Sequence, residues 1–248
     1  MSKSMKIATK IILLIGVVGY LIFAIVKLSQ PAEDVTCCAV EILFQDSLQE
    51  GFVQEGDVQN ILAHNKISPE GQHLCRIDMP NIEKLLTQNP YIKSALCYHT
   101  SEGKLCILVS LMQPILHVIA NNGEDYYLDR TGENMPIGNF NLNLCIATGN
   151  ITKEYAKKEL ASMAEYIHDN DFWNKQIEQI TVSSKDEVTL YPRVGNHTIV
   201  LGNTQNYKDK LDRMLLFYEK GLSKVGWNKY KTINLAFNGQ IVCTKRDK

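Results

Sequence analysis

The sequence has almost no net charge, because 26 Lys and Arg residues stand against 27 Asp and Glu residues. A balance of −1 at pH 7 gives no electrostatic drive toward nucleic acid. Sequence motifs for catalysis are also missing. There is no HExxH, no paired Cys/His spacing for zinc, and no twelve-residue calcium loop. The serine-lysine pattern SEGK at residues 101–104 is a glycine-containing turn without the partner motifs that this chemistry needs. We therefore expect no metal, no cofactor, no small-molecule substrate and no enzymatic activity.

The N-terminus, in contrast, holds a long uncharged run. Residues 11–26 read IILLIGVVGYLIFAIV, and the helix that they predict is extended by flanking residues to about 33 Å, which suffices to cross a hydrocarbon core of about 30 Å. Three lysines precede the run and Glu33 and Asp34 follow it, so the positive-inside rule predicts a cytoplasmic tail at residues 1–10 and a signal anchor at residues 11–28. The alternatives are a cleaved signal peptide and a buried core helix. The predicted membrane-facing residues are Ile11, Leu14, Val18, Leu21 and Ile25.

Seven cysteines follow, without a CxxC pair among them. In an exported domain an odd number leaves at least one cysteine without a partner in the chain. Cys97 and Cys106 are expected to face each other across a hairpin, where they form either a disulfide or two buried thiols. Because a directly opposed cross-strand disulfide is strained, buried thiols are the preferred interpretation.

Hydrophobic periodicity predicts two folded regions outside the anchor. In residues 35–112 we expect a strand at 35–44, a helix at 55–65, a second helix capped by Asp78, and strands at 92–99 and 104–111. In residues 113–248 the pattern predicts a mostly antiparallel sheet, with strands at 115–120, 126–129, 144–147, 177–182, 187–191, 198–201, 232–237 and 240–245. Two helices, at 153–170 and 207–224, are expected to cover it. The predicted fold class is α+β.

The last two strands form the candidate functional site. Asn238-Gly239 is a strong signal for a two-residue turn, so residues 240–245 are predicted to return along residues 232–237. If the last strand lies at a sheet edge, its unpaired backbone groups can bind another chain. Alternation allows only one of Ile241 and Val242 to face the core, and the pattern leaves open which. The predicted partner-binding residues are Phe237, Gln240, Ile241, Val242, Cys243 and Thr244.

Four short motifs, the second of which has two parts, resemble in order those of the bacterial cell-division family FtsQ/DivIB. The segment NPYIKSA at 89–95 is similar to the entry into the hairpin of the family's POTRA domain. The segments LCILV at 105–109 and QPIL at 113–116 resemble the step into its second domain. The segments YYLDRTG at 126–132 and INLAFNG at 233–239 resemble the first and last hairpins of that domain. Asn234 and Ala236 stand where the family usually has Asp and Arg, which affects any charged contact made there.

This resemblance implies a single-pass membrane protein at the division septum, with its bulk on the periplasmic or extracytoplasmic side. It implies a non-enzymatic scaffold with a POTRA domain, which binds FtsB- and FtsL-like membrane proteins and offers its last strand by β-augmentation. The POTRA module is a further contact for septal proteins. Two other hypotheses are a POTRA-bearing secretion or outer-membrane assembly component and an envelope enzyme that modifies peptidoglycan.

Overall fold

The computed structural model describes residues 3–28, 35–45, 53–138, 140 and 142–246. The first element is helix α1, Lys3–Leu28, of which the side chains of residues 13–25 are described. Almost all of these are exposed apolar groups. Within the described residues, no helix meets the combined length and apolarity needed to cross a membrane. The expected helix is therefore present, whereas a membrane span is not found.

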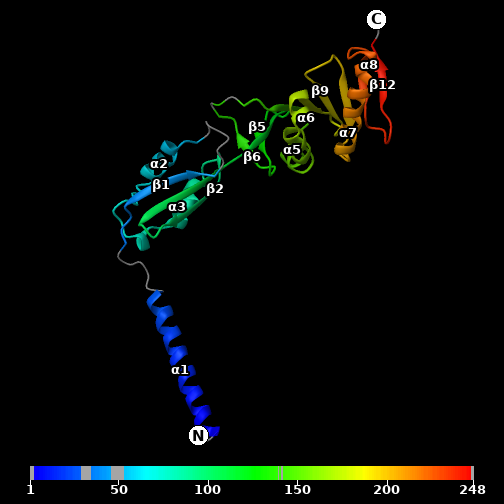
Figure 1. Cartoon of the computed structure of the whole chain (residues 1–248). Coiled ribbons are helices and arrows are strands. Elements are labelled where there is room, and N and C mark those ends of the chain that lie inside the picture. Colours follow the sequence, from blue (N-terminus) through cyan, green and yellow to red (C-terminus); the bar gives the residue numbers. More distant parts are fainter. Residues whose placement is uncertain (1–2, 29–34, 46–52, 139, 141, 247–248) are drawn as a thin grey trace. The chain divides into compact units, whose positions relative to one another are not determined.

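The chain divides into two compact units, and helix α1 is assigned to the first of them. The first contains a three-stranded sheet in the order β1-β3-β2 (Figure 1). Its elements are β1 (Ala39–Phe44), α2 (Glu55–His64), a 3-10 turn η1 (Leu74–Arg76), α3 (Met79–Leu86), β2 (Ile92–His99) and β3 (Lys104–Leu111). The predicted order of strand, two helices and two strands is confirmed. Asp78 caps α3 as expected, since its carboxylate accepts a hydrogen bond from the Asn81 N–H at 3.1 Å.

The turn before β3 shows why its glycine is required. Gly103 has φ of +87°, and a Cβ there would lie 3.0 Å from the Thr36 carbonyl oxygen. The Gly103 oxygen in turn accepts a hydrogen bond from Cys38 N–H at 2.9 Å. The turn is thus held against the segment that leads into β1, and β1 pairs in parallel with β3 from Ala39 opposite Lys104 onward.

The second unit is built on a nine-stranded mixed sheet in the order β12-β11-β10-β9-β8-β7-β4-β5-β6. Five neighbouring pairs are antiparallel, and β4/β7, β7/β8 and β10/β11 are parallel. The strands are β4 (Pro114–Ala120), β5 (Asp125–Asp129), β6 (Asn134–Pro136), β7 (Cys145–Gly149), β8 (Ile177–Val182), β9 (Val188–Pro192), β10 (Thr198–Gly202), β11 (Tyr230–Asn234) and β12 (Val242–Lys245).

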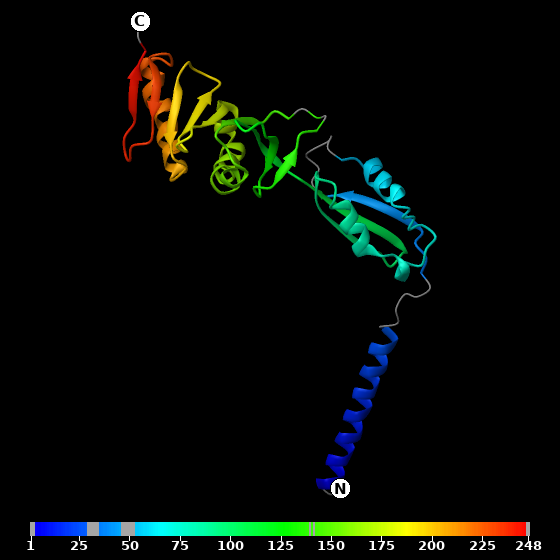
Figure 2. The same cartoon turned by 180° about the vertical axis from the view of Figure 1, so that it is seen from behind.

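Helices pack on this sheet and enclose its main core. They are α4 (Lys153–Tyr155), the π-helical segment η2 (Ala156–Leu160), α5 (Ala161–Asp169), α6 (Asp171–Gln176), α7 (Tyr207–Phe217), the π-helical segment η3 (Tyr218–Leu222) and α8 (Ser223–Val225). Helices α5, α6 and α7 lie beside the strands, as the two opposite views in Figures 1 and 2 show. Fully buried Leu116, Ile180 and Ile233 from the sheet join Trp173 and Met214 from the helices in one cluster. The two predicted helices are present over their full lengths, although each contains a π-helical turn.

Candidate functional site

The predicted partner-binding residues lie at one edge of the nine-stranded sheet. β12 is the outermost strand and pairs only with β11 among the described strands, as Figure 1 shows in red at the C-terminal end. The opposite edge, β6, is three residues long and ends in Pro136, which has no N–H to donate. A short edge that ends in proline resists pairing with another chain. Of the two edges of this sheet, β12 is therefore the better template for an added strand.

The register of β12 settles which side chains face the core. Cys243 stands opposite Ile233, a fully buried core residue, and both Cys243 and Ile241 pack against the main core. Val242 stands opposite Asn234 and is 45% exposed. The sequence pattern left open whether Ile241 or Val242 faces the core, and the structure shows that it is Ile241. Val242 and Thr244 are exposed on the other face.

A turn is present at Asn238-Gly239 as predicted, with Gly239 at φ of +70°, but the two-residue hairpin loop predicted from the sequence is wrong. β11 ends at Asn234 and β12 begins at Val242, so seven residues connect them, and Phe237, Gln240 and Ile241 lie in this connection instead of in strands. One side-chain contact and one sheet contact explain why β11 ends at Asn234, before the predicted end at residue 237. The Asn234 side chain accepts a hydrogen bond from the Ala236 N–H, and the Leu235 N–H donates to Val200 on β10. Phe237 is nevertheless 49% exposed, as a partner-binding residue would be.

Arg213 on α7 holds the connection in place. Its guanidinium donates to the carbonyl oxygens of Gln240 at 2.9 Å and Phe237 at 3.2 Å, and a third contact reaches Leu235 at 3.5 Å. Asp209 orients the guanidinium through a hydrogen bond from Arg213 Nε at 3.1 Å. Sequence reasoning missed this residue. The available signal was the spacing of Asp209 and Arg213, four residues apart on a helix next in the chain to the hairpin.

We expect Arg213→Lys to loosen this connection, because an ammonium group cannot replace the guanidinium fork. The loss of about one net hydrogen bond, about 1 kcal/mol, corresponds to about fivefold faster amide exchange in residues 235–245. Hydrogen exchange followed by mass spectrometry measures this. Asp209→Ala, which keeps the guanidinium and removes only the carboxylate that orients it, is the matched control and should raise exchange less than Arg213→Lys. Equal exchange in Arg213→Lys and the unaltered chain would show that the fork does not hold the connection.

The end of β12 fixes the direction in which its backbone groups point. The Arg246 N–H donates to the Lys229 carbonyl at 3.1 Å, and the Arg246 guanidinium donates to the Asn196 carbonyl. Alternate residues of an antiparallel strand direct their N–H and C=O groups to opposite sides. The backbone groups of Cys243 and Lys245 therefore point away from β11, toward the open edge.

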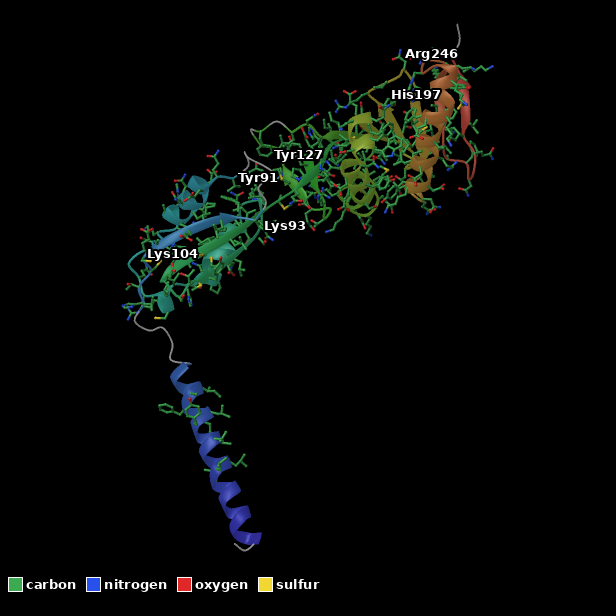
Figure 3. The ribbon with its side chains drawn as sticks, viewed as in Figure 1. Tyr91, Lys93, Lys104, Tyr127, His197 and Arg246 are labelled. Atoms are coloured by element: carbon green, nitrogen blue, oxygen red, sulfur yellow. The ribbon has the colours of Figure 1, made fainter. Side chains whose placement is uncertain are left out.

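Buried His197 lies near this end of the strand (Figure 3). Its Nε2 is 2.9 Å from the Tyr218 hydroxyl, and burial, together with the charge of Arg246, lowers the pKa of its imidazole. The ring is therefore neutral at pH 7. Its burial and its contact with the Tyr218 hydroxyl indicate a structural role.

Most of the cysteines are buried as small apolar side chains. All seven are free, and four of them, Cys37, Cys97, Cys106 and Cys145, are buried. Burial raises the pKa of the Cys97 thiol to about 12 and that of Cys145 to about 12, and it also raises the pKa of Cys243. Protonated thiols are poor nucleophiles. The preferred interpretation of Cys97 and Cys106 as buried thiols is confirmed.

The remaining predicted residues are spread along the chain. Leu14, Val18, Leu21 and Ile25 are exposed on α1, and the side chain of Ile11 lies outside the described ones. The serine-lysine pattern at 101–104 forms the turn between β2 and β3, and its Lys104 pairs with Glu41 at 2.6 Å. Among the described residues, no group of three or more His, Cys, Asp or Glu side chains could hold a metal.

A βααββ module followed by a large mixed sheet defines an α+β protein with a POTRA-like domain, and the POTRA-like domain model matches residues 35–110. The model for FtsQ/DivIB, C-terminal related, matches residues 113–244, more than half of the 248 residues. The chain belongs to this FtsQ/DivIB-related family. A search of curated proteins found no match. The two domains indicate a division-associated scaffold, and domains of these kinds are generally non-catalytic.

Proposed function

We propose that the chain is a membrane-anchored, non-enzymatic divisome scaffold at the division septum, which captures FtsB- and FtsL-like membrane proteins. The observation that carries the proposal is the position of β12 at the edge of its sheet, with the backbone groups of Cys243 and Lys245 directed outward. A partner segment in extended conformation adds a tenth strand there. Main-chain hydrogen bonds supply affinity, and side chains next to Val242 and Thr244 on one face and Ile241 on the other supply specificity.

The anchor in this proposal is α1. Its support comes from the uncharged run at residues 11–26, from the lysines that precede the run, and from the helical conformation of Lys3–Leu28. In the proposed topology, the tail at residues 1–10 is cytoplasmic and both folded units lie outside the inner membrane. The POTRA-like module is placed nearer to the membrane in the sequence, where it is free to contact other septal proteins.

Fluorescence microscopy tests the scaffold role. A full-length chain with a fluorescent protein at its N-terminus should form a band at mid-cell in dividing cells of its own source. The matched control replaces residues 1–28 with an unrelated single-span anchor, and the band should persist because the folded units carry the recruitment. A uniform envelope signal from both fusions throughout division would refute the scaffold proposal. A band that is lost only in the control would assign recruitment to α1.

A further inference from the structure

A second candidate binding site lies on the helical layer, between α5 and the first turn of α7. A groove of about 440 Å³ opens there, and its walls include Ser162, Glu165, Tyr166, Asp169, Tyr207 and Lys208. Figure 1 shows α5 and α7 as neighbours, and the two helices are in contact. The α5 residues among them recur at helical spacing, so they form one outward stripe. None of these side chains belongs to the β12 edge.

Two aromatic rings line the groove in a fixed arrangement. Tyr166 and Tyr207 meet edge to face, with ring centroids 5.7 Å apart. The Tyr166 hydroxyl donates to Asp212 at 3.2 Å, and the Tyr207 hydroxyl donates to the Ser162 carbonyl at 3.0 Å. Because both hydroxyls are already bonded, the rings present their π surfaces and not their polar ends to a ligand.

The carboxylates of the groove are also held in place. Arg130, which follows β5, donates to Asp169 at 2.7 Å and 2.5 Å and to Glu165 at 3.3 Å. These bonds lower the pKa of Asp169, so the carboxylate stays ionised at neutral pH. Together with Asp212, the site has three carboxylates against the charges of Arg130 and Lys208. The remaining charge of the site is negative.

A cation of the chain itself already occupies the aromatic pair. Lys208 Nζ lies 5.6 Å from the Tyr166 centroid and 6.0 Å from the Tyr207 centroid, within the range of a cation–π interaction. Lys208 is exposed and is not among the residues of the described ion pairs, so its long side chain is able to move away. The position of Lys208 thus shows that the two rings accommodate a cation, and a second cation from outside can displace Lys208.

We propose that this groove binds an arginine side chain from a basic segment of a partner polypeptide, and that Lys208 occupies the site in the absence of the partner. A guanidinium stacks on an aromatic face and pairs with carboxylates, whereas an ammonium such as that of Lys208 is more strongly hydrated. A sugar would prefer an open flat ring, and here the two rings stand at 64° to each other. The negative balance disfavours an anion.

The test uses the full-length chain purified in detergent at physiological salt. A labelled peptide with four Gly-Arg repeats is titrated and binding is followed by fluorescence anisotropy. The control peptide has citrulline, the neutral isostere of arginine, at each arginine position. We expect the arginine peptide to bind about tenfold more tightly. Equal binding of the two peptides would overturn the proposal.

Variants of the groove identify the site. Tyr207→Leu should weaken binding of the arginine peptide about tenfold, while Tyr207→Phe, which keeps the ring, should retain it. Lys208→Gln should strengthen binding about threefold or more, because it removes the competing cation. A mere loss of structure would not increase affinity. If Lys208→Gln leaves affinity unchanged or lowers it, the displacement idea is wrong.

Discussion

Lys245→Pro weakens capture of the FtsB-like partner at least about tenfold and leaves the protein folded, if β12 is the docking edge. Lys245 directs its N–H away from β11, so proline at this position removes a donor only from the open side. The side chain is exposed, and no core contact is lost. Loss of one outward hydrogen bond and the clash of the ring with an incoming strand together cost at least about 1.5–3 kcal/mol, which is about a tenfold to hundredfold loss of affinity.

Two matched variants make this test specific. Lys245→Ala removes the ammonium group and keeps the N–H, and it should capture the partner as the unaltered chain does. Thr244→Pro removes a donor on the side that faces β11, and it should lower the free energy of unfolding. Capture is measured by co-purification from dividing cells, and folding by circular dichroism. If Lys245→Pro captures the partner normally, β12 is not the docking edge.

Ile241→Lys is a poorer choice for this purpose. From the sequence alone, Ile241 and Val242 are equally suitable positions for a disruptive charge. The structure shows that Ile241 packs against the main core, so a lysine there would lower the free energy of unfolding and confuse the two effects. Val242→Lys, on the exposed face, is the informative substitution.

Local patterns sufficed to predict the first unit, and the reason is physical. Asp78, the turn at Gly103 and the alternation in β3 are short-range signals that agree with one another, and the strands 92–99 and 104–111 were predicted at their observed bounds. β6 and α6 were missed because a strand of three residues and a helix of six are too short for an apolar pattern to repeat several times.

Long-range contacts explain what the sequence could not predict in the second unit. The closing hairpin was predicted from Asn238-Gly239, but the three carbonyls held by Arg213 and the bond from Leu235 to β10 set the true length of the connection. These contacts join residues more than twenty positions apart. Tertiary hydrogen bonds, and not the turn propensity of Asn-Gly, determine where the strands end, and local sequence patterns do not contain this information. The edge position of the last strand, which the sequence argument could only assume as a condition, is observed in the structure.

Asp129 should be among the most sensitive residues of the second unit. It is fully buried and ends β5 within the motif YYLDRTG. One carboxylate oxygen accepts from the Thr131 N–H at 2.6 Å and from its hydroxyl at 3.0 Å, and the other accepts from the Gln113 N–H at 3.0 Å. Asp129 therefore ties the turn after β5 to the residue that precedes β4, and Gly132, with φ of +77°, allows the chain to complete that turn.

Asp129→Ala leaves these donors without an acceptor in a buried place, and we expect the free energy of unfolding of the second unit to fall by about 2–4 kcal/mol. Asp129→Asn should cost almost as much, because its amide has only one acceptor oxygen and its NH₂ group would face another donor. Urea unfolding followed by tryptophan fluorescence measures the effect, since Trp173 and Trp227, the only two tryptophans, belong to this unit. Thr131→Val, which removes one hydroxyl, should cost only about 1 kcal/mol. If Asp129→Asn is as stable as the unaltered chain, acceptance of several hydrogen bonds is not the reason for aspartate in this motif.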